Sequence, residues 1–416
     1  MTRISTALGL VLAAASAPAV AQYNAPPAAP QQTATQGQAT AEKAPEIKPS
    51  RAALKAIVEL QNAVRAKDFA NVPAKLAAAQ AVASTKEDRY LIGVFQREAA
   101  IAQGDNSALA AATEALANSG VLDATKTSAL YLDLGVKQFN AKQFGPSVAA
   151  FQRAVTLTPN DPEALELLGQ GLAAAGQKTE AVGALQRAIQ ASLAAGRKPT
   201  ESLFKRAVSA AYEAQSPAAI ELSRQWAGAY PTADSWRNSI AIYRNMTKPD
   251  VEGTLVLLRL LQAKGALNSA ADYNLFATAA ADQSNLVEAQ AVIDQGIAAK
   301  VVDPSSPLFR ETIAALKTKA KMTEADLDVA AKTAVNGMAL LRIGDRYYAM
   351  GRYAKAVDAY RQALGKPGVD ANVANLHIGM ALARSGDKAG ATAAFNAVTG
   401  PRAELAKYWL MYLQQA

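Results

Sequence analysis

The feature that most constrains the fold is a pattern of residues that returns at a fixed interval. Residues 128–159 and 162–193 align position by position, with the matched residues 34 positions apart. The matches are Leu134 with Leu168, Gly135 with Gly169, Phe151 with Leu185, and Ala154 with Ala188. A unit that repeats in this way cannot bury its apolar face alone, so neighbouring units must stack to form a continuous core. The repetition therefore predicts an array of similar units.

The same pattern returns near the C-terminal end of the chain. Two further units align there, about 35 residues apart. The first carries Ile343, Gly344, Tyr347, Gly351, Ala356, Tyr360 and Ala363, and the second carries Ile378, Gly379, Leu382, Gly386, Ala391 and Phe395. With Pro159 closing one of the earlier copies, these marks resemble the tetratricopeptide repeat family. The resemblance is strong over residues 128–195 and 337–399 and weaker elsewhere.

The resemblance implies an all-α fold, a right-handed α-solenoid of tandem helix-turn-helix repeats with about ten helix pairs and a C-terminal capping helix. Composition agrees, because alanine, the strongest helix former, makes up roughly a quarter of the chain. The expected array covers residues 50–416, with its clearest repeats at 128–161, 162–195, 337–371 and 372–401, divergent repeats at 50–118 and 200–335, and the capping helix at 402–415. Breaks at Gly196–Pro199 and Asp303–Pro307 are expected to bend the array without dividing it into domains.

The first 21 residues have the three parts of a secretory signal peptide. Arg3 supplies a positive charge, an apolar run extends from about Ala7 to Ala15, and Ala19-Val20-Ala21 provides a cleavage site. The run is too short to span a membrane, and a chain without cysteine carries no lipoprotein anchor. We therefore expect cleavage after Ala21 and a soluble periplasmic protein. Residues 22–49, rich in proline, alanine and glutamine, are predicted to form a disordered linker.

Composition and motifs argue against catalysis. The lack of cysteine excludes a disulfide framework, a thiolate zinc site and a catalytic cysteine. The G-x-G-x-x-A string at 169–174 matches a dinucleotide-binding fingerprint, but its glycines occupy repeat positions inside a predicted helix. His377, the only histidine, is interpreted as a solvated or hydrogen-bonded surface residue. We expect no enzymatic activity, no cofactor and no metal site.

The family resemblance also implies a concave groove, lined by the first helix of each repeat, that holds a peptide or a helix of another protein. Transferred to this sequence, the groove positions are Glu163, Glu166 and Gln170 in one unit, Met338, Leu341, Asp345 and Tyr348 in a second, and Met380 and Arg384 in a third. The lysine–asparagine clamp that some members use for carboxyl-terminal peptides is not recognisable here.

Signal peptide and repeats together favour an exported, non-enzymatic scaffold or adaptor that binds other proteins or peptides of the bacterial cell envelope. Two alternatives stay open: an accessory or catalytic component of cell-wall or polysaccharide processing and export, and a self-assembling structural protein. The formal net charge of +8 comes from basic residues dispersed among acidic ones, which argues against a nucleic-acid partner.

Overall fold

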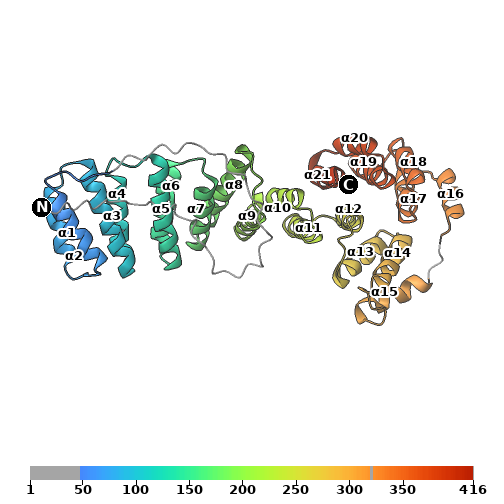
Figure 1. The fold of residues 1–416 in the computed structure, drawn as a ribbon. Coiled ribbons are helices and arrows are strands. Elements are labelled where there is room, and N and C mark those ends of the chain that lie inside the picture. The colour runs from blue at the N-terminus through green and yellow to red at the C-terminus, as the bar shows by residue number, and fades with distance from the viewer. Residues whose placement is uncertain (1–46, 319–321, 416) are drawn as a thin grey trace, which may run out of the picture. The chain divides into compact units, whose positions relative to one another are not determined.

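The computed structural model describes residues 47–318 and 322–415. The predicted signal peptide and almost all of the predicted linker, residues 22–49, therefore lie outside the described residues. Every regular element in the described part is a helix, which confirms the all-α prediction. The chain divides between Ala194 and Ala195 into two compact units, here called the N-terminal unit (47–194) and the C-terminal unit (195–415) (Figure 1).

The N-terminal unit consists of four consecutive helix pairs. The pairs are α1 (Leu54–Arg65) with α2 (Val72–Val82), α3 (Lys86–Gln103) with α4 (Asn106–Ala117), α5 (Ala124–Asn140) with α6 (Phe144–Leu157), and α7 (Pro162–Ala174) with α8 (Lys178–Ala194). The second helix of each pair packs on the first helix of the next pair. Each pair therefore covers the apolar face that its neighbour leaves open.

Glycines at two of the repeat positions let the helices of a pair approach closely. A β-carbon at Gly135 would lie 2.5 Å from Cε1 of Phe151, and one at Gly169 would lie 2.5 Å from Cγ of Leu185. Any larger residue would have to push its neighbour away. Gly169 lies inside α7, so the G-x-G-x-x-A string is a helix-packing feature, as the sequence predicted.

Asp88 links the first described residues to helix α3 through hydrogen bonds. Its carboxylate accepts hydrogen bonds from the backbone N–H groups of Ser50 (2.8 Å), Ser84 (3.0 Å) and Thr85 (3.1 Å), and from the Ser50 hydroxyl (2.8 Å). Asp88 also forms a capping box with Thr85 at the start of α3. Burial on its own would raise the pKa of this fully buried carboxyl, but the hydrogen bonds hold the pKa well below its usual range.

The C-terminal unit contains six more pairs and a final helix. The pairs are α9 (Glu201–Glu213) with α10 (Ala218–Ala229), α11 (Ala233–Thr247) with α12 (Val251–Ala263), α13 (Ala270–Asp282) with α14 (Leu286–Ala298), α15 (Pro307–Thr318) with α16 (Glu324–Thr333), α17 (Gly337–Ala349) with α18 (Tyr353–Leu364), and α19 (Ala371–Ser385) with α20 (Lys388–Asn396). The final helix is α21 (Ala403–Gln415). The described residues thus contain twenty successive helices and a last helix, which is the number that ten predicted pairs and a capping helix require.

One pair in the C-terminal unit departs from regular stacking. Helix α15 packs on α13 and α14, whereas α16 packs on α17, so the two helices do not form the hairpin expected over residues 305–334. Figure 1 shows α16 standing apart from α15. As a result α14 contacts α17 directly, and Nη2 of Arg346 donates to the carbonyl of Ser284 at 3.3 Å. The displaced pair lets two repeats that are not neighbours in sequence meet.

Helix α21 closes the C-terminal unit. Nε1 of its buried Trp409 donates to the carbonyl of Val256 on α12 at 3.3 Å, and the Tyr408 hydroxyl is hydrogen-bonded to the Ser239 hydroxyl on α11 at 3.0 Å. The same helix packs on α19 and α20. Helix α12 therefore contacts α13 on one side and α21 on the other, and one hydrophobic core runs through both contacts. The predicted capping helix thus also joins the last repeat to an earlier one.

The effect of the break at Gly196–Pro199 on the fold differs from the effect that the sequence predicted. We expected a bend within one array, but the division between the two compact units falls at this point. The connecting residues between α8 and α9 include Gly196, whose φ of +67° is left-handed, and Pro199, which lacks an N–H group. Neither residue continues a helix well, so the chain ends one stack here and begins another.

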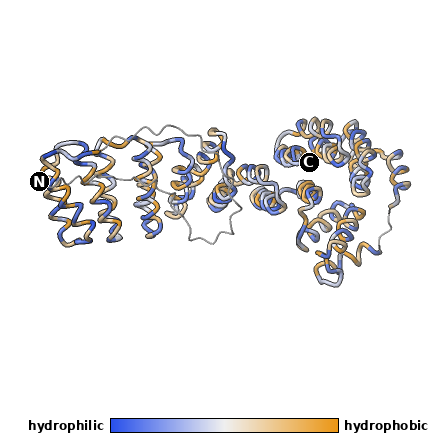
Figure 2. The backbone as a smooth tube through the Cα atoms, viewed as in Figure 1, coloured by the Kyte–Doolittle hydropathy of each residue, from blue (hydrophilic) through white to orange (hydrophobic). Residues whose placement is uncertain are grey.

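Hydrophobic and hydrophilic residues alternate along the helices of both units (Figure 2). This is the pattern of helices that pack on one face and meet water on the other. Over residues 47–318 and 322–415, none of the helices combines the length and the hydrophobicity that crossing a membrane requires.

Candidate binding pocket

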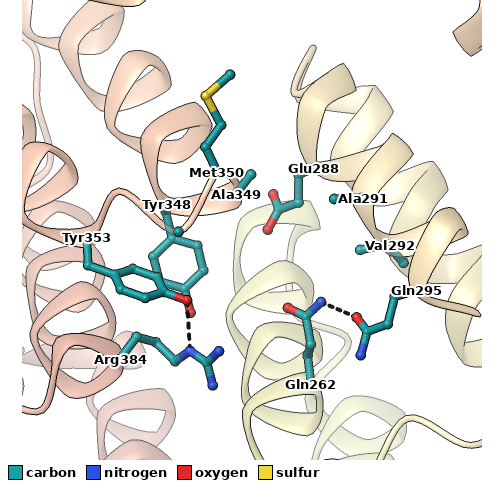
Figure 3. Close-up of a pocket in the computed structure, with 11 residues that line it drawn as sticks. Gln262, Glu288, Ala291, Val292, Gln295, Tyr348, Ala349, Met350, Tyr353 and Arg384 are labelled. Atoms are coloured by element: carbon teal, nitrogen blue, oxygen red, sulfur yellow. Dashed lines mark hydrogen bonds between the residues drawn. The ribbon is translucent and has the colours of Figure 1, made fainter. Parts of the chain in front are cut away.

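The C-terminal unit contains a cavity of about 340 Å³ where α12 and α14 face α17, α18 and α19 (Figure 3). The lining residues are Gln262 on α12, Glu288, Ala291, Val292 and Gln295 on α14, Tyr348 and Ala349 on α17, Met350 and Gly351 in the following turn, Tyr353 on α18, and Arg384 on α19. This volume lies at the lower end of the range for ligand pockets. The site depends on the displaced pair, because its two walls come from repeats that regular stacking would separate.

The wall formed by α17, α18 and α19 presents an oriented guanidinium group. Nε of Arg384 donates to the hydroxyl of Tyr353 at 3.2 Å, and the guanidinium carbon lies 5.7 Å from the centre of the Tyr353 ring. The Tyr353 ring meets the ring of Tyr348 edge to face, with the centres 5.4 Å apart. Figure 3 shows the three side chains together on one side of the pocket. Their mutual contacts fix the direction in which Arg384 points.

The opposite wall carries a pair of amide side chains. Nε2 of Gln262 donates to Oε1 of Gln295 at 2.6 Å (Figure 3). Gln295 is exposed and Gln262 is half-buried. A primary amide has two donor hydrogens and an acceptor oxygen, so the pair keeps unused donors and acceptors that a ligand can reach.

Glu288, also on this wall, is bound from behind by a buried arginine. Nε and Nη2 of Arg259 donate to its two carboxylate oxygens, each at 2.7 Å, and Nδ2 of Asn285 donates to one of them at 2.9 Å. Burial on its own would lower the pKa of Arg259, but the nearby carboxylates of Glu288 and Asp345 raise it. The arginine therefore stays charged, and the bidentate pair neutralises Glu288.

A buried network continues from Arg259 to the only histidine. Nη1 of Arg259 lies 3.5 Å from Oδ1 of Asp345, which accepts a hydrogen bond from the Tyr360 hydroxyl at 2.9 Å. Nδ1 of His377 lies 3.0 Å from the same oxygen, and Nε2 lies 2.5 Å from Oε1 of Glu252. Burial on its own would lower the pKa of His377, but the two carboxylates outweigh it and raise the pKa to about 9. The imidazole is therefore protonated at neutral pH.

The position of His377 corrects the sequence interpretation. It was predicted to lie on the surface, yet its side chain is 1% exposed and makes an ion pair through each ring nitrogen. The expected hydrogen bonding is present, but solvation is not. The physical reason is that Glu252 on α12 contacts His377 on α19. In an array in which each repeat packs only on the next, this side of α19 would be exposed to water.

The structure brings together three of the nine predicted groove residues. Tyr348 and Arg384 line the pocket, and Asp345 lies behind them in the buried network. Leu341 and Met380 are buried, which corrects the prediction that they line an open groove. They are covered because α14 packs on α17 and α21 packs on α19. Asp345 is half-buried, and its carboxylate is engaged by Arg259, Tyr360 and His377.

The other four predicted groove residues lie elsewhere. Met338 is exposed at the start of α17, outside the pocket. Glu163 is exposed on α7 of the N-terminal unit, where Glu166 and Gln170 are half-buried and Nε2 of Gln170 donates to Glu166 at 3.4 Å. Gln170 borders a small, mainly apolar cavity of about 20 Å³. A role for these four residues in binding stays a prediction.

Sequence reasoning missed Gln262, Glu288, Gln295 and Tyr353. These residues lie on α12, α14 and α18, the second helices of their pairs, whereas the groove prediction used first helices only. One signal pointed to the region, because Arg259 interrupts the apolar run 255–261 and a buried charge needs a partner. No comparable signal marks the two glutamines.

Comparison with protein families matches the tetratricopeptide repeat to residues 132–197 and 341–405. The two matched segments together cover less than half of the chain. The second segment supplies the Tyr348, Tyr353 and Arg384 wall of the pocket. Together with the succession of helix pairs, the match confirms that the described chain is an α-solenoid of helical repeats. Tetratricopeptide repeat proteins generally mediate interactions with proteins or peptides.

Several solved structures with tetratricopeptide repeats are similar at low sequence identity. YrrB, whose structure has an unusual peptide-binding site, is 19% identical over 43% of this chain and 87% of its own, with a TM-score of 0.29. A tetratricopeptide repeat protein from Parabacteroides merdae is 11% identical over 79% and 99%, with a TM-score of 0.27. The TPR2AB domain of yeast Sti1, in complex with pHSP90, is 13% identical over 70% and 99%, with a TM-score of 0.26. No curated protein matches the chain.

Proposed function

We propose that the protein is a non-enzymatic adaptor of the bacterial cell envelope, which binds a peptide or a segment of a partner protein in the pocket of the C-terminal unit. The observation that carries this proposal is the composition of the pocket. A guanidinium group, two amide side chains and two tyrosines converge on one cavity, and one of its walls belongs to a tetratricopeptide repeat. Convergent polar groups in a preformed cavity are typical of binding sites.

The pocket favours binding over catalysis. Its one carboxylate, Glu288, is held by two hydrogen bonds from Arg259, an arrangement that suits structure better than proton transfer. The tyrosine hydroxyl of Tyr348 is a poor acid, because burial raises its pKa well above the ordinary value. A partner group in this cavity therefore meets donors and acceptors that hold it in place.

The envelope location rests on the signal-peptide pattern of residues 1–21. Expression of the full chain in a bacterial host, followed by release of periplasmic contents and N-terminal sequencing, tests it. We expect the released protein to begin at Gln22. A protein that stays in the cytoplasm with residues 1–21 attached would contradict export.

Site-specific photo-crosslinking in cells tests the binding function. A benzophenone amino acid placed at Gln295, an exposed lining residue, should yield a defined covalent adduct with a partner protein on irradiation. Asp358, exposed on α18 and outside the pocket, is the matched control position. Adducts that form equally from both positions, or from neither, would contradict partner binding at the pocket.

A further inference from the structure

The two charged residues that line the pocket differ in whether they are paired. Apart from tyrosines, the ionisable lining residues are Glu288 and Arg384. Glu288 is neutralised by the bidentate contact with Arg259, whose distances of 2.7 Å leave no room for an intervening water. The positive charge of Arg384 has no such acidic partner among the described residues, because its nearest polar contact is the neutral Tyr353 hydroxyl. Arg384 is therefore the charged lining residue that is left without a carboxylate partner among the described residues.

Arg384 is held in position before any ligand arrives. Its Nε is engaged by Tyr353, and its guanidinium lies over the Tyr353 ring. The two terminal nitrogens keep their hydrogens free and form the end of a planar fork, which matches the spacing of two carboxylate oxygens. Because the side chain is already ordered, binding costs less rotational freedom than it would at a flexible surface arginine.

We propose that Arg384 binds a carboxylate on an extended segment of the partner polypeptide, and that Gln262 and Gln295 pair with the backbone amides beside that carboxylate. This inference rests on the proposed function and names the chemistry that the same pocket recognises. The carboxylate comes from an acidic side chain or from a chain terminus, both of which offer the same two oxygens.

Pocket size and the tyrosines favour such a segment over other ligands. A volume of about 340 Å³ is small for a helix and suits one or two side chains. A sugar usually stacks on an open aromatic face, but a guanidinium already lies over each ring, that of Arg259 at 5.4 Å from Tyr348 and that of Arg384 at 5.7 Å from Tyr353. The amide pair, in contrast, can both donate to and accept from a peptide group.

Methyl NMR of the chain spanning residues 22–416 tests the proposal. Met350 lines the pocket and is one of six methionines within residues 22–416, so its labelled methyl signal, assigned with Met350→Leu, reports binding at this site. The probes are three capped tripeptides: Ac-Ala-Glu-Ala-NH2 with a side-chain carboxylate, Ac-Ala-Ala-Ala-OH with a terminal carboxylate, and Ac-Ala-Gln-Ala-NH2 with neither. We expect at least one carboxylate peptide to bind roughly 10- to 100-fold more tightly than the glutamine peptide.

Two variants and one competitor decide the outcome. Arg384→Gln should abolish the preference for carboxylate, whereas Arg342→Gln, which removes an exposed charge from α17 outside the pocket, should keep it. Far-UV circular dichroism checks that both variants are folded. Equal binding of the glutamine peptide, a preference that survives Arg384→Gln, or inorganic phosphate binding as tightly as the best peptide would each overturn the proposal.

The two proposals fail in distinguishable ways. If Gln295 crosslinks to a partner but the peptides show no carboxylate preference, the pocket binds proteins by another chemistry and only the present inference fails. If the carboxylate peptides bind as expected but no adduct forms in cells, the chemical inference stands and the proposed adaptor function fails.

Discussion

The protonation state of His377 tests whether α12, α17 and α19 are held together by the ion pairs of this histidine. The imidazole bridges Asp345 and Glu252, at 3.0 and 2.5 Å, and so links α19 to α17 and to α12. It is the only histidine in the chain, so one NMR signal follows it without ambiguity. Raising the pH is the perturbation, and we expect the imidazole to keep its proton until the pH approaches 9.

The size of the effect follows from the pKa. Burial would lower the pKa of His377, but the carboxylates of Asp345 and Glu252 raise it from 6.5 to about 9. Because the folded-state pKa is above the unfolded one, the contribution is fully present below pH 6.5 and disappears as the pH rises through 9. A difference of this size corresponds to roughly 3 kcal/mol of unfolding free energy. At the acid end, the pKa of Asp345, about 2, keeps its carboxylate charged.

Two measurements check this reasoning. The imidazole signal of isotope-labelled protein gives the pKa directly, and urea unfolding followed by tryptophan fluorescence gives the stability between pH 6 and 10. All three tryptophans, residues 226, 236 and 409, lie in the C-terminal unit, so their fluorescence reports on the correct part of the chain.

A variant separates the two opposing causes of the shift. Asp345→Asn removes one carboxylate and should lower the pKa of His377 markedly, since burial then meets less opposition. The closed network is refuted if the wild-type imidazole titrates at or below pH 6.5, or if Asp345→Asn leaves its pKa unchanged.

Three further substitutions test the packing. Gly135→Ala should destabilise the N-terminal unit by about 1–3 kcal/mol, because the new methyl group overlaps Phe151; an unchanged thermal midpoint by circular dichroism would contradict this. Asp88→Ala should cost about 2 kcal/mol and speed amide hydrogen exchange over residues 50–60, because the N–H group of half-buried Ser50 loses its charged acceptor; unaltered exchange would show that this contact is dispensable. Trp409→Ala should destabilise the C-terminal unit by about 3–5 kcal/mol in urea unfolding, and a loss below 1 kcal/mol would show that α21 does not close it.

The local features of this fold could be predicted from the sequence. Pairs such as α17 and α18 are encoded within one repeat, where Gly344 lies against Tyr360 and a glycine turn follows. Each requirement concerns residues a few turns apart on two adjacent helices. Spacing therefore located the helices even between 200 and 335, where the family marks are weak, although α15 and α16 do not form the expected hairpin there. It also placed the last helix within a residue of its observed start.

The candidate site could be predicted only in part, because it depends on contacts between distant repeats. Transferring family positions found Tyr348 and Arg384, which lie on first helices. Such a transfer assumes that every repeat packs on the next one. It therefore does not predict that α15 and α16 separate, or that α14 packs on α17. His377 and Glu252 are 125 residues apart, and no periodic pattern relates them. The burial of Met380 and Leu341 follows from the same closure.

Glu288 lines the pocket and also belongs to the buried network. Ligand affinity and the stability of the C-terminal unit are therefore coupled. The pocket exists only while α12 and α14 stay against α17 and α19, which are the contacts that Arg259, Asp345 and His377 hold. A ligand that binds this closed arrangement and not an open one stabilises it by its own binding free energy. Loss of the proton from His377 weakens the same contacts, so high pH must reduce ligand affinity and stability together. Had these contacts been apolar throughout, neither property would respond to this proton.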